Sequence, residues 1–147
     1  MKELPETTQA PIRQFFEQMI PFNRLLGMQL EVLGVGFARI AVPFRDELIG
    51  DPARPALHGG VLSATLDAVG GAAAFTMVKL PGDRLSTIDL RVDYLRPADL
   101  REVIAEATVS RMGNRVASVD LVSFHRDSPD RHLATGRAVY NIRRAGD

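Results

Sequence analysis

The chain has 147 residues, which predicts one domain that is large enough to bury its own core. It contains no cysteine, and this excludes disulfide bonds, thiol nucleophiles and thiolate metal sites. Lys and Arg number 18 and Asp and Glu number 18, so a formal net charge of zero argues against nucleic acid or an anionic membrane as a partner.

Residues 1–24 are expected to form a polar tail and one short helix ahead of the domain. Residues 1–10 contain no apolar run of the kind that a secretory signal needs, which predicts a cytoplasmic protein. Apolar side chains then recur at helical spacing over 12–20, and Pro21 is expected to end this helix. The rest of the chain, residues 25–147, is predicted to be a single domain.

Two strands and a loop are predicted next. Apolar and polar residues alternate over 28–32, and Gly34 and Gly36 mark a turn. Residues 37–43 are then predicted to form the returning strand, and residues 44–57 a loop.

Residues 59–78 are predicted to form a central buried helix. The segment is almost continuously apolar or small, and Asp67 is its only charged residue. A membrane span has this length. However, the many Ala and Gly residues, the central carboxylate and the amphipathic strands on either side favour a helix inside a globular domain.

Four antiparallel strands complete the chain. A period of two over 88–94 predicts a half-buried strand that ends before Pro97. Gly113 and Asn114 form a two-residue hairpin signal between two of the later strands. These later strands are predicted over 102–111, 115–125 and 132–143.

The three histidines give no sign of a metal site. His58, His125 and His132 are far apart in the sequence, and none forms a His-x-x-x-His pair. His125 and His132 flank the polar loop over 126–131, so both are expected to be exposed.

Together these elements predict an α+β fold. A helix as apolar as 59–78 must be covered on most sides, and a strongly curved antiparallel sheet of about five to six strands wrapped around it meets that need. Strands and helices do not alternate along the chain, so a doubly wound α/β fold is excluded.

One face of the predicted helix carries very small side chains around a carboxylate. Small residues let a ligand or another backbone approach closely, and glycine inside a helix costs about 1 kcal/mol relative to alanine, so it needs a reason. The alternative is that Asp67 only reaches solvent or pairs with an arginine. The face consists of Gly60, Ser63, Asp67, Gly70, Gly71 and Ala74.

The sequence Leu57-His58-Gly59-Gly60 stands where this helix begins. The first N–H groups of a helix lack intrahelical acceptors and carry partial positive charge. They could polarise an acyl carbonyl as an oxyanion hole does. The alternative is ordinary helix-entry geometry.

Several motifs resemble those of hotdog-fold thioesterases of the phenylacetate-degradation (PaaI) type. The likeness is carried by Ile49–Asp67, by Ser86–Leu90 continuing to Tyr94–Ala98, and by the turn at Arg111–Arg115. It covers about residues 25–143. It implies a long helix wrapped by an antiparallel sheet, and a homodimer or dimer of dimers whose active sites use residues from both chains.

The resemblance also implies roles for the helix residues. Asp67 matches the catalytic carboxylate, which acts as general base on water or as nucleophile. Gly59 matches the backbone N–H donor to the thioester carbonyl. His58 matches the motif histidine, which organises the loop, and Gly60 and Ser63 are expected to contact substrate.

Outside the helix, Thr87 matches a position that helps to place the attacking water, and Ser86 is adjacent to it. Some members carry Asn or Gln before the His-Gly-Gly motif. Asp51 stands in that region here, and it is either a departure from the pattern or a second carboxylate.

The predicted reaction is hydrolysis of an acyl-CoA thioester. Coenzyme A leaves as part of the substrate, so no separate cofactor is expected. Arg111, Asn114 and Arg115 could contact the nucleotide phosphates, or they could form a solvated hairpin tip. Two other readings stay open, namely a non-catalytic acyl-CoA-binding module and a hotdog dehydratase.

Overall fold

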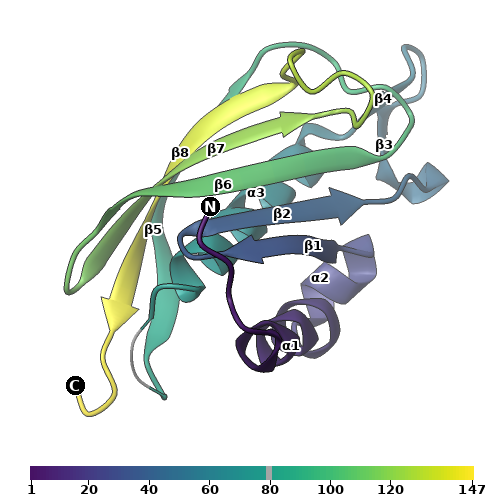
Figure 1. Cartoon of the computed structure of the whole chain (residues 1–147). Helices are drawn as coiled ribbons and strands as arrows, with labels where there is room; N and C mark the ends of the chain where they lie inside the picture. Colours follow the sequence, from purple (N-terminus) through teal and green to yellow (C-terminus); the bar gives the residue numbers. More distant parts are fainter. Residues whose placement is uncertain (79–80) are drawn as a thin grey trace.

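A curved antiparallel sheet wraps around one long helix in the computed structural model, which describes residues 1–78 and 81–147 (Figure 1). The helix is α3, Gly59–Phe75. The spatial order of the strands is β1-β2-β6-β7-β8-β5. Their bounds are Gln29–Gly34, Phe37–Val42, Val103–Met112, Val116–Phe124, Ala134–Arg143 and Arg84–Tyr94. The hotdog fold predicted from the sequence is confirmed.

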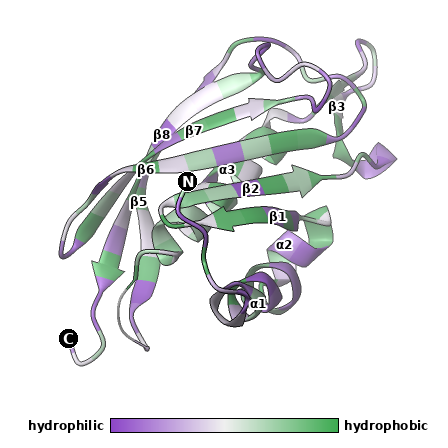
Figure 2. Cartoon of the chain, in the orientation of Figure 1, coloured by the Kyte–Doolittle hydropathy of each residue, from purple (hydrophilic) through white to green (hydrophobic). Residues whose placement is uncertain are grey.

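The core lies between α3 and the sheet. Leu66, Val69 and Ala73 on α3 are fully buried, and so are Val103, Ala105 and other side chains of the facing strands. Apolar and polar residues alternate along the strands (Figure 2), as expected for a sheet with one buried face.

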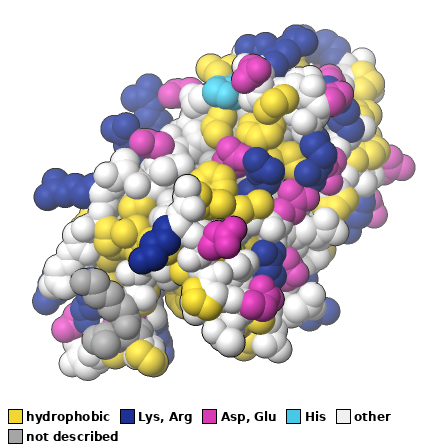
Figure 3. Space-filling view, in the orientation of Figure 1, with side chains coloured by type: hydrophobic (Ala, Val, Ile, Leu, Met, Phe, Trp, Pro, Cys, Tyr) yellow, Lys and Arg dark blue, Asp and Glu magenta, His cyan; other side chains and the backbone are white. Residues whose placement is uncertain are grey.

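Charged side chains cover the face that β1, β2 and β6 turn to solvent. Arginines and carboxylates are interspersed there (Figure 3), and one example is the ion pair between Arg39 and Glu106. No helix within the described residues has both the length and the apolar character that crossing a bilayer requires.

The N-terminal segment is more ordered than the expected tail. Helix α1 spans Glu6–Gln14, a π-helical turn spans Phe15–Met19, and α2 spans Pro21–Leu26. The helix over 12–20 does end before Pro21, as expected, because the π-helical turn stops at Met19 and Ile20 is extended. A second helix, which was not predicted, starts directly at Pro21. Proline is favourable in a first helical turn because its missing N–H needs no partner there, so Pro21 begins α2.

The loop predicted over 44–57 contains a short ladder that leads into α3. Strands β3, Ile49–Asp51, and β4, Ala56–Leu57, pair antiparallel. A Cβ on Gly50 would lie 2.5 Å from the Cα of His58, so glycine permits this close approach.

The prediction that His125 is exposed was wrong, because only 4% of its surface is accessible. Its Nε2 accepts the Asp99 N–H at 3.0 Å, so Nδ1 carries the proton and donates to the Glu102 carbonyl at 2.8 Å. The loop between β5 and β6 thus satisfies its backbone groups through a buried imidazole. His132 is half-buried.

Candidate active site

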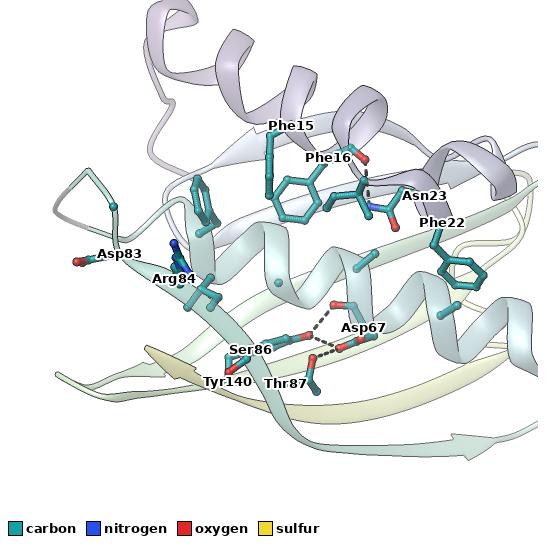
Figure 4. A pocket seen from close by; sticks show the side chains of 17 residues that line it. Phe15, Phe16, Phe22, Asn23, Asp67, Asp83, Arg84, Ser86, Thr87 and Tyr140 are labelled. Atoms are coloured by element: carbon teal, nitrogen blue, oxygen red, sulfur yellow. Dashed lines mark hydrogen bonds between the residues drawn. The ribbon is translucent and has the colours of Figure 1, made fainter. Parts of the chain in front are cut away.

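The Asp67 carboxylate is held by two side chains from the sheet. Thr87 donates its hydroxyl to Asp67 Oδ1 at 2.8 Å (Figure 4). The Tyr140 hydroxyl lies 2.7 Å from the Asp67 carbonyl oxygen and 3.3 Å from Oδ1. Within residues 1–78 and 81–147, Oδ2 has no hydrogen-bond partner, so the half-buried carboxylate keeps one oxygen available to accept a proton.

Gly70 lets Tyr140 reach this carboxylate. A Cβ on Gly70 would lie 2.3 Å from the Tyr140 hydroxyl oxygen, so any side chain there would displace the phenol. Burial raises the pKa of Tyr140 above its usual range, and the negative charge of Asp67 raises it further. The phenol therefore stays protonated and remains a hydrogen-bond donor.

The register of the sheet brings Thr87 and Tyr140 together. They are direct cross-strand neighbours in the β5–β8 ladder. The ladder skips from Thr87 to Asp89, so Ile88 is an extra residue that bulges out of β5.

At the start of α3, His58 caps the helix. Its Nδ1 accepts the Gly60 N–H at 2.8 Å, and a Cβ on Gly60 would lie 2.8 Å from that same nitrogen. His58 therefore caps the first turn of α3 through its side chain. The Gly60 N–H is occupied, whereas no partner for the Gly59 N–H is found among the described residues.

Tyr94, at the end of β5, covers Gly59. Its hydroxyl donates to the Gly59 carbonyl at 3.1 Å, and its ring lies 3.3 Å from where a Cβ of Gly59 would be. These contacts hold Gly59 at the start of α3, and its free N–H is the candidate carbonyl donor.

Within one copy of the chain, Gly59 and Asp67 are too far apart to contact the same substrate carbonyl. They are eight residues apart on one helix, which separates them by about 12 Å at a rise of 1.5 Å per residue. A reacting carbonyl must lie about 3 Å from both its donor and the attacking group. A site that uses both residues therefore needs a second copy of the chain.

Beside Asp67 lies a cavity of about 720 Å³ with a largely apolar lining. Figure 4 shows Phe15 and Phe16 pointing toward α3 from the N-terminal helical segment. Phe15 stacks on Phe75 of α3 with ring centroids 6.1 Å apart. Phe22, in the first turn of α2, lines the same cavity.

The sequence did not predict that the N-terminal helical segment would line this cavity. It placed the N-terminal segment outside the domain, and it did not single out Tyr140. The helical spacing of Phe15 and Phe16 was a signal for a buried face, but it did not indicate what that face covers.

The other predicted residues are placed as follows. Ser86 and Thr87 line the cavity, while the Ser63 hydroxyl donates to the Gly60 carbonyl at 3.3 Å. The carboxylate of Asp51 accepts the N–H groups of Ala53 and of the next residue, so it caps its own turn. No group of three or more His, Cys, Asp or Glu that could hold a metal ion occurs within the described residues.

The hairpin predicted to meet phosphates lies at the opposite end of β5 from Gly59. The Asn114 carbonyl accepts the Arg144 Nε–H at 2.8 Å. The neighbouring Arg143 lies opposite Arg84, the first residue of β5, in the β5–β8 ladder. Tyr94, which contacts Gly59, is the last residue of that 11-residue strand. The two ends are about 30 Å apart at 3.3 Å per residue.

Comparison with known proteins identifies the fold and its family. Residues 55–130 match the thioesterase superfamily. Across 143 residues the chain is 34% identical to the medium/long-chain acyl-CoA thioesterase YigI of Escherichia coli strain K12, and the match covers 89% of this chain and 91% of YigI. The chain belongs to the thioesterase superfamily.

Solved structures agree with this assignment. A Shewanella oneidensis protein related to the thioesterase superfamily matches this thioesterase with a TM-score of 0.83 and 30% identity, covering 93% of this chain and 96% of that one. A thioesterase family protein from Silicibacter pomeroyi has a TM-score of 0.81 at 24% identity, covering 90% and 96%, and supports the fold alone. The predicted class of enzyme, a thioester hydrolase, is confirmed.

Proposed function

We propose that this thioesterase hydrolyses acyl-CoA at sites formed between two copies of the chain. The proposal rests on one observation, namely that Gly59, with its free N–H, and Asp67, with its free carboxylate oxygen, are separated by a helical rise of about 12 Å on α3. In a homodimer, or in a dimer of dimers, Gly59 of one copy would face Asp67 of the other.

The edge strand β5 supports such a dimer. It is 11 residues long and has a free edge in the sheet order, and Ile88 and Tyr94 on it are 58% and 53% exposed. Long exposed edges of this kind invite pairing with another chain. A second copy that added its own β5 would cover this edge and continue the sheet.

The reaction follows from the two groups. The Gly59 N–H polarises the acyl carbonyl, and Asp67 either takes a proton from the attacking water or attacks the carbonyl carbon itself. In the first route the water oxygen bonds to the acyl carbon, the carbon–sulfur bond breaks, and coenzyme A leaves as its thiolate. In the second route the Asp67 oxygen forms that bond as the thiolate leaves, and water then cleaves the resulting anhydride to the free acid and the Asp67 carboxylate. Thr87 and Tyr140 hold the carboxylate in place for either route.

The cavity beside Asp67 would take the acyl group. Its size and apolar lining suit a medium or long chain, in line with the name of the relative YigI. Within the superfamily, the pattern from His58 to Asp67 is the basis for assigning the phenylacetate-degradation type. We further propose that the enzyme acts in the cytoplasm and needs no separate cofactor.

The basic hairpin fits the same dimer. Two β5 strands that pair antiparallel bring the Arg84 end of one copy beside the Tyr94 end of the other. Arg111, Asn114 and Arg115 of one copy would then approach the helix start that the other copy contributes, where they could contact the phosphates of coenzyme A.

Thiol release from a panel of acyl-CoAs, from short aliphatic to long-chain and aryl, tests the function. We expect turnover of medium or long chains, and a fall in kcat by a factor of about 10² to 10⁴ in Asp67→Asn, because that variant lacks the proton acceptor. The control is Asp120→Asn, since Asp120 pairs with Arg137 away from the cavity. Saturable binding of acyl-CoA without any turnover would instead favour a binding module.

A further inference from the structure

Arg96 is an arginine whose charge is not matched by the protein. Its Nε is the one buried side-chain nitrogen or oxygen without a hydrogen-bond partner among the described residues. No carboxylate in the described part of the chain forms an ion pair with it. A buried donor without an acceptor costs free energy, and a bound anion would remove that cost.

Arg96 lines two cavities. One, of about 350 Å³, is lined by Gly59, Tyr94 and Arg96, so it begins at the start of α3. The other, of about 110 Å³, is lined by Arg96, Arg131 and other polar residues. Arg96 and Pro97 line both, so the cavity at the candidate carbonyl donor and the cavity with Arg131 lie on either side of the same two residues.

The backbone places the two arginines close together. The Arg96 N–H donates to the Leu133 carbonyl at 3.3 Å, and Arg131 lies two residues before Leu133. Arg131 is exposed and forms no ion pair with any described residue. Both cations therefore line the small cavity without a protein carboxylate as partner.

The remaining groups of this cavity are already satisfied. Arg101 donates to Asp127 at 2.6 Å and to Asp99 at 3.3 Å. His125 is neutral in the tautomer that its two backbone partners require. Arg96 and Arg131 are therefore the groups of this cavity that could bind a negatively charged ligand.

We propose that Arg96 and Arg131 bind a phosphate of the coenzyme A part of the substrate. The proposal rests on the proposed function. The thioester carbonyl would lie at the Gly59 N–H, the pantetheine arm would follow the larger cavity past Tyr94, and a phosphate would enter the smaller one. Arginine suits this role because its planar guanidinium donates paired hydrogen bonds to phosphate oxygens.

The test compares acyl-CoA with the acyl-pantetheine thioester of the same chain, which carries no phosphate. In Arg96→Gln and in Arg131→Gln we expect KM for acyl-CoA to rise about tenfold with kcat unchanged, since a charge-assisted hydrogen bond is lost. Both constants for acyl-pantetheine should stay at the wild-type value. Arg137→Gln is the matched control, because Arg137 pairs with Asp120 and lines neither cavity.

Acyl-dephospho-CoA, which lacks the 3′-phosphate, identifies the phosphate that is bound. If the variants lose their effect on KM with this substrate, the 3′-phosphate occupies the cavity, and if the effect persists, the diphosphate does. Either result supports the proposal.

Other outcomes overturn it. Unchanged KM for acyl-CoA in both variants would exclude the site, and an equal loss for acyl-CoA and acyl-pantetheine would show that Arg96 only supports the fold. If wild-type protein hydrolyses neither substrate, the proposed function fails separately. Calorimetric binding of coenzyme A to wild type and to Arg131→Gln then decides whether the anion site exists.

Discussion

At the scale of single residues, the Tyr140 hydroxyl joins the sheet to α3 at Asp67. Its pKa is raised above the ordinary value of 10.0 by burial and by the Asp67 charge. The unfolded phenol therefore ionises near pH 10 while the folded one keeps its proton, and raising the pH above 10 favours the unfolded chain.

This difference predicts how stability depends on pH. Above about pH 10, Tyr140 should lower the free energy of unfolding by up to about 1.4 kcal/mol per pH unit. The effect should be absent below pH 9. Urea unfolding of wild type and Tyr140→Phe between pH 8 and pH 11 measures it, because every other titrating group is common to both proteins. Parallel pH profiles would contradict the prediction.

At the scale of elements, the N-terminal helical segment forms a wall of the cavity beside Asp67. Phe15 packs on Phe75, and the side-chain amide of Asn23 donates to the Phe16 carbonyl at 3.0 Å, which ties α2 to the π-helical turn. The segment would thereby limit the space for the acyl chain in the proposed site.

We therefore expect Phe15→Ala to move the preferred acyl chain to greater length. Each further methylene that is buried is worth about 0.8 kcal/mol, roughly fourfold in kcat/KM. The measurement is kcat/KM across saturated acyl-CoAs of increasing length. Met19→Ala is the control, because Met19 is 63% exposed and does not line the cavity. An unchanged length optimum would exclude Phe15 from the acyl site.

At the scale of the whole molecule, the proposed site needs Gly59 from one copy and Asp67 from another. Gly59→Pro should remove the N–H donor and keep the helix, since proline is tolerated at a first helical position. Gly59→Ala is its control, because it adds a Cβ next to Tyr94 but keeps the N–H.

A mixed dimer tests this arrangement directly. A heterodimer of one Gly59→Pro chain and one Asp67→Asn chain contains one intact site and one doubly defective site, so it should have about half of the wild-type activity. Each homodimer should be nearly inactive. Purification through two different tags isolates the heterodimer, and an inactive heterodimer would show that each site lies within one copy.

The sequence by itself was enough to predict the long helix, the strands of the main sheet and the candidate reacting groups. Period-two alternation placed the strands of the sheet, and the run of small residues placed α3 with Asp67 near its middle. The His58-Gly59-Gly60 motif marked the helix start, where the structure shows that His58 caps the first turn. These features are local, because spacing and residue type along a few turns or strand residues decide them.

Only the tertiary structure decided what surrounds those groups. Tyr140 reaches Asp67 from 73 residues away through the β5–β8 register, and local periodicity does not encode which strands pair. Likewise, the N-terminal segment became a cavity wall, and His125 became buried between two backbone partners. The distance from Gly59 to Asp67 follows from helix geometry. The proposal of a site between two copies arose only from the structure, which leaves the Gly59 N–H and one Asp67 oxygen without partners among the described residues.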